Sequence, residues 1–185
     1  GDKTGKAPRV EPDVEPEYTF WGSILEDAIV TGYGLRTGRA ALPFQLSLRS
    51  TEWPWLSATP DALVTDDSEA AARLPRISAT LDSLRLAMRL GKEQQTPAEV
   101  LWRELEALAV ELAAHAQGWW PLQIKNIGYR SAEHWVEGVP IYYTVQCVHE
   151  AMVWGATRTT GAALVAGQRL VWDDVDLADE EVLKR

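Results

Sequence analysis

Cysteine and long apolar runs are what this sequence most clearly lacks. Its 185 residues include a single cysteine, Cys147. No apolar stretch approaches the roughly 18 residues needed to span a bilayer. A lone thiol excludes an internal disulfide, a four-thiolate zinc site and an iron–sulfur cluster held within the chain. Nothing in the sequence resembles a signal peptide. We therefore expect a protein of the reducing cytoplasm, with no part inserted into a membrane.

Basic residues are also few. The chain carries 18 Lys and Arg against 27 Asp and Glu, a net charge of −9, which argues against a protein that coats polyanions generally. A nuclease is not excluded, because local charge can differ from the total. Hydrophobic residues make up 46% and charged residues 24% of the chain, as is typical of a folded globular protein. We expect one domain over residues 1–185, with an extended lead-in over residues 1–17.

The segment after the lead-in predicts one helix and two strands. Apolar residues recur at helical spacing from Phe20 to Ile29, and we expect the helix to end before Gly32. Alternating apolar and polar residues from Pro43 to Arg49 predict a half-buried strand, and a second strand is expected at Leu56–Thr65. The Trp53-Pro54-Trp55 sequence between them predicts a hairpin turn.

Residues 66–118 change character and predict a helical hairpin. The first helix carries apolar residues at helical spacing from Ile77 to Met88 and is expected to stop at Gly91. Thr96-Pro97-Ala98-Glu99 reads as a capping box, with proline at the first position of the second helix. That helix carries a leucine stripe from Leu101 to Leu112. The stripe is explained most simply as core packing against the first helix; a subunit or partner interface is the alternative.

The last third of the chain predicts more strands around one helix. The expected elements are a strand at 119–126, a mostly buried helix from Pro140 to Gly155, closing strands at 162–166 and 170–172, and a helix over 178–185. No internal repeat or low-complexity tract occurs. The overall order of helices and strands is that of an α/β layer arrangement.

Four polar residues from separate segments could form a metal pocket. Asp61 is a carboxylate in an expected strand with small apolar neighbours, where acids are unusual. Gln123 and Lys125 lie two residues apart, so they share one face of a strand while their apolar neighbours share the other. If the two strands pair, these three groups meet at one edge of the sheet, and Glu26 of the preceding helix joins them.

Hydrolysis of a phosphodiester would need a set of this kind. A hard divalent ion held by carboxylates polarises the phosphate and lowers the pKa of an attacking water. A lysine beside that water, here Lys125, orients it and offsets charge in the transition state. The alternative is structural: Asp61 caps a turn after Pro60, while Gln123 and Lys125 line a solvated sheet face. The spacing alone leaves both interpretations open.

Five short segments occur in an order and approximate spacing that match a known family: Lys3-Thr4-Gly5, Trp21-Gly22-Ser23-Ile24-Leu25-Glu26, Thr59-Pro60-Asp61-Ala62, Leu122-Gln123-Ile124-Lys125, and Tyr143-Thr144-Val145-Gln146 with His149. Together they resemble the phage recombination exonucleases of the lambda exonuclease and YqaJ group, over residues 1–65 and 119–172. The resemblance implies a restriction-endonuclease-like α/β fold. Its central mixed sheet is flanked by helices, and residues 66–118 are an inserted helical hairpin.

The same resemblance implies a 5′ to 3′ exonuclease that acts on double-stranded DNA ends and depends on Mg²⁺ or Mn²⁺. The implied site residues are the catalytic Asp61, Gln123 and Lys125, the metal ligands Glu26, Asp61 and Gln123, and the neighbouring Tyr143, Gln146 and His149. Implied partners are a single-strand annealing protein and further copies of the chain in a ring-shaped trimer around DNA. Family members carry an earlier segment that helps recognise the 5′ end, and we expect it to be absent from this sequence.

Position 123 departs from the family pattern, which has glutamate there. An amide carbonyl lacks the charge of a carboxylate, so we expect weaker metal binding and weakened or lost activity. The near-isosteric change suits a deliberate substitution that traps a substrate complex; a natural variant is the alternative. Three functions remain open: this exonuclease, another metal-dependent nuclease of the same fold, and a non-catalytic DNA-binding or assembly subunit.

Several cations are candidates for contacts with DNA phosphates: Arg85, Arg89, Lys92 and Arg130. The first three follow i, i+4, i+7 spacing on one face of the first hairpin helix. A solvated face balanced by Asp82 and Glu93 is the alternative explanation.

Overall fold

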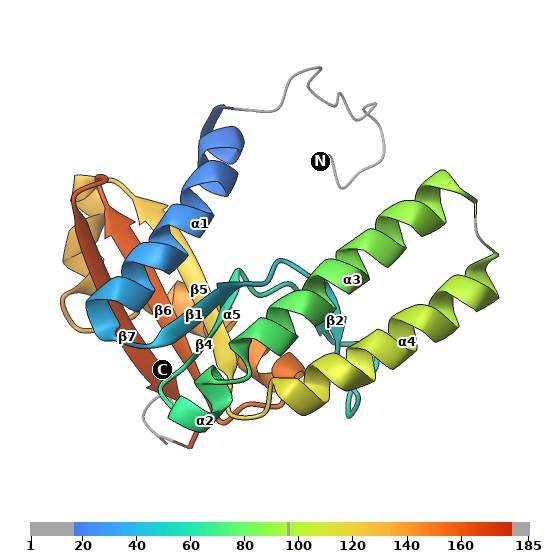
Figure 1. Cartoon of the computed structure of the whole chain (residues 1–185). Coiled ribbons are helices and arrows are strands. Elements are labelled where there is room, and N and C mark those ends of the chain that lie inside the picture. Colours follow the sequence, from blue (N-terminus) through green and yellow to red (C-terminus); the bar gives the residue numbers. More distant parts are fainter. Residues whose placement is uncertain (1–16, 96, 179–185) are drawn as a thin grey trace.

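The computed structural model describes residues 17–95 and 97–178 and shows an α/β domain built on a five-stranded mixed sheet (Figure 1). The elements in chain order are α1 (Glu17–Thr37), β1 (Ala40–Pro43), β2 (Leu48–Arg49), β3 (Ser57–Ala58), β4 (Ala62–Thr65), α2 (Ser68–Ala71), α3 (Leu74–Glu93), α4 (Ala98–His115), β5 (Trp120–Ile127), the 3-10 helix η1 (Tyr129–Trp135), α5 (Ile141–Trp154), β6 (Arg158–Val165) and β7 (Arg169–Asp176). Within these ranges, no helix is both long enough and apolar enough to cross a bilayer.

The sheet has the strand order β1-β4-β5-β6-β7. Strands β5 and β6 are parallel and are joined through α5, while the other neighbouring pairs are antiparallel. Strands β2 and β3 form a separate antiparallel hairpin, which confirms the turn expected at Trp53-Pro54-Trp55. The expected mixed sheet flanked by helices is therefore confirmed.

Two helices cover opposite faces of the sheet. On one face, Val30 and Tyr33 of α1 pack against Leu122 and Ile124 of β5. On the other face, α5 packs Cys147 against residues of β6. Burial of apolar surface on both sides stabilises the sheet. The expected division of β5 is confirmed, because Leu122 and Ile124 face α1 while Gln123 and Lys125 lie on the opposite face, towards α5.

Helix α5 follows the sequence prediction closely. It begins after Pro140, and Gly155 ends it with a left-handed φ of +80° while donating its N–H to the Ala151 carbonyl at 2.8 Å. Only one face of the helix is buried: Val145 is 64% exposed. The expectation of a mostly buried helix was therefore wrong for the outer face.

The helical hairpin expected over residues 66–118 is confirmed in α3 and α4. At its base, Leu81 and Leu112 pack with Phe44 and Trp119, so the leucine stripe is core. Farther out, the two helices project away from the sheet together (Figure 1). Helix α3 continues through Gly91 to Glu93. A Cβ at Gly91 would lie 2.6 Å from Leu101 Cδ2, so the glycine allows α4 to pack closely against α3. The expected stop at Gly91 was therefore wrong.

Two further boundaries were wrong because tertiary packing outweighs local propensity. Helix α1 does not end at Gly32 but runs to Thr37, since burial of Tyr33 against the sheet exceeds the roughly 1 kcal/mol that a helical glycine costs. The strand expected at Pro43–Arg49 is divided into β1 and β2. Gln45 adopts a positive φ of +52°, which interrupts the extended conformation.

The second expected strand, Leu56–Thr65, is likewise divided. Residues 59–61 lie between β3 and β4 and are not part of either strand, so Asp61 is just outside the strand in which it was expected. Helix α2, capped by the Asp67 side chain, was not expected. Pro97 is the cap of α4 and not its first residue. The closing strands β6 and β7 are longer than predicted.

Some expectations fall outside the described residues. These are most of the lead-in over 1–17 with its Lys3-Thr4-Gly5 motif, Thr96 of the capping box, and nearly all of the helix over 178–185.

The close packing of Gly161 on β6 against Val139, just before α5, can be tested by substitution. Gly161 of β6 is the register partner of Gln123, and a Cβ there would lie 2.6 Å from Val139 Cγ2, just before α5. We expect Gly161→Ala to lower the free energy of unfolding by about 1–3 kcal/mol, because the branched valine cannot move aside. Urea denaturation measures this. Gly128→Ala is the matched control, since a Cβ at Gly128 would meet nothing within 4 Å. Equal effects of the two substitutions would contradict the close packing.

Candidate functional site

Asp61 lies where strands β4 and β5 part. Their pairing runs from Val64 opposite Trp120 to Ala62 opposite Leu122 and then stops. Beyond that point, the Asp61 Oδ2 atom accepts a hydrogen bond from the Ile124 backbone N–H at 2.7 Å. The carboxylate thus takes the place of a backbone carbonyl in satisfying β5. Asp61 therefore lies just before β4 begins, next to the central strand β5.

Gln123 and Gln146 connect Asp61 to α5 through their amides. Gln123 is 2% exposed and donates from Nε2 to Asp61 Oδ2. Its Oε1 accepts from Gln146 Nε2 at 2.7 Å. Gln146 Nε2 also donates to Glu150 Oε1 at 3.2 Å. Two carboxylates are therefore joined by a chain of two amides, which we call the Asp61–Glu150 chain.

Lys125 lies on the same face of β5 as Gln123. Its Nζ is 5.4 Å from the centre of the Tyr143 ring, at cation–π distance. Its positive charge opposes the rise in the pKa values of Asp61 and Glu150. Tyr143 thus contacts the site through Lys125, and the structure brings Asp61, Gln123, Lys125 and Gln146 together as the sequence predicted.

Glu26 reaches this region from α1. Its Oε2 accepts from Gln45 Nε2 at 2.6 Å. Gln45 is held by its own backbone, because its N–H donates to the Pro60 carbonyl at 3.1 Å, next to Asp61. Burial, and then repulsion from Asp61, raises the pKa of Glu26. Gln45 was not among the expected site residues; its left-handed φ is a feature that sequence periodicity does not reveal.

Glu150 is the second residue that the sequence analysis missed. It is 2% exposed, and its Oε2 has no hydrogen-bond partner among the described residues. Burial, and then repulsion from Asp61, raises the pKa of Glu150 to about 8. The available signal was an acid three residues after Cys147, on the buried face of the helix. Cys147 itself is no nucleophile, since burial raises the pKa of its thiol to about 12.

His149 has a structural role. Its Nε2 lies 2.8 Å from the Ser57 carbonyl oxygen, which ties α5 to the β2–β3 hairpin. It makes no hydrogen bond to the Asp61–Glu150 chain. His149 is therefore near the site only because it lies about one helical turn after Gln146 on α5.

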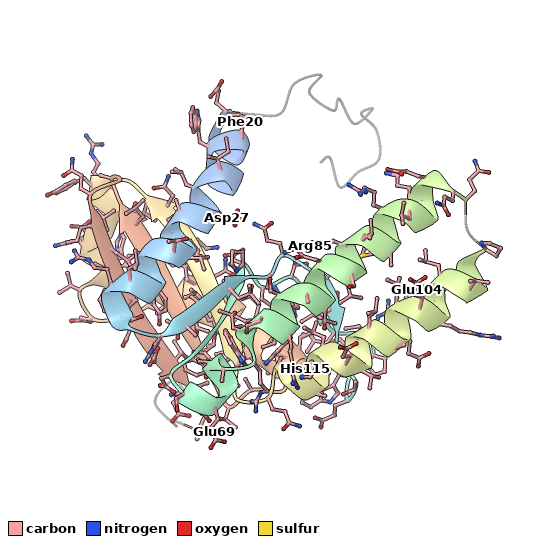
Figure 2. All side chains as sticks on the ribbon, viewed as in Figure 1. Phe20, Asp27, Glu69, Arg85, Glu104 and His115 are labelled. Carbon is pink, nitrogen blue, oxygen red and sulfur yellow. The ribbon has the colours of Figure 1, made fainter. Side chains whose placement is uncertain are left out.

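Of the four cations expected to contact phosphates, Arg85 is held by a hydrogen bond to the backbone of another segment. Arg85 Nη2 donates to the Phe44 carbonyl at 3.0 Å, next to Gln45. Figure 2 shows Arg85 on the side of α3 that faces α1. Arg85 is also 3.5 Å from Asp82, and Arg89 is 4.0 Å from Glu93, as the solvated-face alternative required. The remaining two candidates, Lys92 and Arg130, are exposed.

The donor set offers partial support for a divalent cation. Asp61 supplies carboxylate oxygens, which hard cations such as Mg²⁺ and Mn²⁺ prefer, and Glu150 carries an unpartnered buried oxygen. The Gln123 amide turns its nitrogen towards Asp61 and its carbonyl oxygen towards Gln146. Within residues 17–95 and 97–178, however, no three His, Cys, Asp or Glu side chains are close enough together to hold one ion. A cation would therefore rely on the amide as well as on acids.

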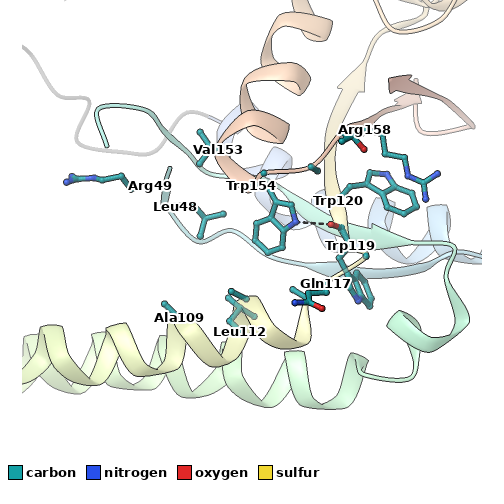
Figure 3. A pocket seen from close by; sticks show the side chains of 16 residues that line it. Leu48, Arg49, Ala109, Leu112, Gln117, Trp119, Trp120, Val153, Trp154 and Arg158 are labelled. Atoms are coloured by element: carbon teal, nitrogen blue, oxygen red, sulfur yellow. Dashed lines mark hydrogen bonds between the residues drawn. The ribbon is translucent and has the colours of Figure 1, made fainter. Parts of the chain in front are cut away.

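A separate cavity of about 570 Å³ lies between α4 and the start of β5 and β6 (Figure 3). Trp119, Trp120 and Trp154 line it, and Trp154 Nε1 donates to the Trp119 carbonyl at 2.8 Å. Arg158 lies over the Trp120 ring at 3.5 Å from its centre. No described residue lining the cavity is an Asp, Glu or His. The cavity lies where α4 of the hairpin meets the sheet, and it does not include Asp61 or Gln123.

Burial of Glu150 predicts that replacing it with glutamine stabilises the fold at high pH but not at low pH. The pKa of Glu150 is about 8 in the fold against 4.5 ordinarily, so the contribution of this residue to stability is greatest below pH 4.5 and is lost as pH rises through 8. In metal-free protein, we expect Glu150→Gln to raise the free energy of unfolding by about 1 kcal/mol or more at pH 9. Near pH 5 we expect little change. Urea unfolding at both values measures this. An equal effect at pH 5 and pH 9 would mean that Glu150 does not lose its proton within this range. Glu104→Gln, an exposed acid on α4, is the control.

Comparisons with protein-family models, curated proteins and solved structures find no match to this chain. What the site does must therefore be inferred from its own residues.

Proposed function

We propose that this chain is a divalent-metal-dependent nuclease that acts on double-stranded DNA ends, with a restriction-endonuclease-like fold. The observation that carries the proposal is the position of Asp61 against Gln123, with Lys125 on the same strand face. These residues come from two separate segments of the chain. They meet where two central strands part, as an Asp, Gln-x-Lys set would require.

The chemistry is divided among these residues. Asp61, the Gln123 carbonyl and Glu26 would hold a Mg²⁺ or Mn²⁺ ion, which when bound polarises a phosphate and acidifies a water. Lys125 orients that water and offsets negative charge in the transition state. The Tyr143 ring positions the ammonium group of Lys125. Gln45 holds the carboxylate of Glu26 in place.

The substrate would lie beside Arg85. The Arg85 guanidinium is held by its hydrogen bond to the Phe44 carbonyl. Phe44 precedes Gln45, whose side chain donates to Glu26, so Arg85 lies on the side of the site where Glu26 is. Fixing a cation before binding reduces the entropy lost when it contacts a phosphate. The direction of degradation, the trimer and the annealing partner rest on the motif resemblance alone and remain part of the proposal.

One observation favours a second function, a non-catalytic DNA-binding or assembly subunit. The Gln123 amide donates to Asp61 and accepts from Gln146, so both of its polar atoms are partnered within the protein. A site whose central group is already satisfied without a metal has less need to bind one.

Restoring the carboxylate distinguishes these functions. We expect Gln123→Glu to raise Mg²⁺-dependent degradation of linear duplex DNA at least about 10-fold, because the site gains a charged ligand. Adding Lys125→Ala should then lower the rate at least about 100-fold. A labelled linear duplex measures the rate, and a closed circle of the same sequence tests for dependence on ends. No metal-dependent degradation by Gln123→Glu would favour the non-catalytic subunit.

The proposed DNA contact has its own test. We expect Arg85→Ala to weaken binding of linear duplex and to lower the slope of log affinity against log salt by about 1. Fluorescence anisotropy at several salt concentrations measures both. Arg103→Ala on α4 makes the same charge change elsewhere on the hairpin. If the two variants lose affinity equally, the effect is one of total charge and Arg85 is no specific contact.

A further inference from the structure

Helix α4 carries an exposed row of residues on the side that borders the cavity of Figure 3. Trp102, Glu106, Ala109 and Ala113 follow i, i+4, i+7, i+11 spacing, so they lie along one face of the helix. All four are exposed, and the Trp102 side chain is 69% exposed. We call these residues the outer row of α4. The outer row is distinct from the leucine stripe, which packs into the core of the hairpin.

The outer row is large at one end and small at the other. Ala109 and Ala113 line the cavity of about 570 Å³, and Figure 3 shows Ala109 on the side of α4 that faces Trp154. Trp102 lies about 16 Å from Ala113 along the helix, at 1.5 Å per residue. A cavity of this volume has room for an indole ring. One face of α4 therefore presents both an exposed indole and a space that an indole fits.

The charges near the outer row are complementary as well. Helix α4 carries four glutamates and one arginine, and Glu106 lies one turn after Trp102. The charged residues that line the cavity are both arginines, Arg49 and Arg158. Arg158 is held by Asp66 at 2.6 Å, whereas Arg49 is exposed at the end of β2. An acidic helix that enters this cavity therefore meets the opposite charge.

We propose that the outer row binds a second copy of this chain, with the two α4 helices antiparallel across a two-fold axis. Residues 99–106 of one copy then lie opposite residues 109–116 of the other. Trp102 of each copy enters the other copy's cavity beside Ala113, and Glu106 faces Arg49 across the contact. A second copy suits this face because the same row supplies the large residue and the space for it, which a two-fold contact uses twice.

This contact goes beyond the proposed nuclease and does not depend on it. It is also separate from the ring-shaped trimer, because the motif resemblance that implies the trimer leaves out the hairpin. A two-fold contact through α4 predicts an even number of chains: a dimer, or a hexamer where the trimer forms as well.

The mass of the full chain in solution tests the contact. We expect sedimentation equilibrium over a range of concentrations to show dimers or hexamers. Trp102→Ala should raise the dissociation constant of the two-fold contact at least about 10-fold, because loss of a central tryptophan is among the costliest changes at an interface. Trp21→Ala is the matched control, since it removes a 51% exposed indole from α1, whose described residues do not line the cavity. It should change the constant less than about twofold.

Reversed charges test the antiparallel arrangement. Arg49→Glu places an acid opposite Glu106 and should raise the dissociation constant at least about threefold. Adding Glu106→Arg should restore it. Glu104→Arg changes the total charge equally but lies on the far side of α4 from the outer row, so it should not restore the contact. Far-UV circular dichroism checks that each variant folds, as changes at these exposed positions should allow.

Three results would overturn the proposal. The first is an unmodified chain that stays monomeric or trimeric at every concentration, which would leave the cavity to a different occupant. The second is an equal effect of Trp102→Ala and Trp21→Ala. The third is recovery from Arg49→Glu that is as complete with Glu104→Arg as with Glu106→Arg. Each of these concerns assembly alone, so the metal-dependent nuclease stands or falls by its own measurements.

Discussion

The hydrogen bond from the Ile124 backbone N–H to the Asp61 carboxylate is the contact on which the rest of the site depends. Two strands can part inside a sheet only if the backbone groups they release find other partners. Asp61 meets that requirement with a side chain, and the cost is a buried carboxylate. Asp61 makes two further hydrogen bonds. Its side chain accepts from the Gln123 amide, and its backbone carbonyl accepts from the Phe44 N–H at 3.0 Å.

These bonds connect the site to three parts of the fold. Gln123 leads to Gln146 and so to α5, and the backbone pairing at Phe44 leads to Gln45 and from there to Glu26 on α1. Apolar cores on both faces of the sheet hold these helices in place. Acids whose pKa values are raised by burial oppose folding, so the packing around them must offset that cost. Such an arrangement is expected of a functional site more than of a structural core.

The features that the sequence predicted are those set by local periodicity. Alternation in β5 placed Gln123 and Lys125 on one face, and helical spacing identified α5 and both helices of the hairpin. The features that it missed depend on contacts between distant segments. Gln45 enters the site because its backbone turns left-handed beside Pro60. Glu150 reads as an ordinary helical acid until α5 is packed on the sheet, which is what buries it.

Gln123 is best understood from what an amide can do and a carboxylate cannot. An amide donates and accepts at once, and Gln123 uses both abilities, towards Asp61 and from Gln146. A glutamate at this position could still accept from Gln146, but it would face the Asp61 carboxylate without a hydrogen to share. Two ionised carboxylates at such a distance repel strongly unless a cation or a proton lies between them. Glutamine therefore makes the metal-free fold more stable and lowers the attraction for a cation at the same time.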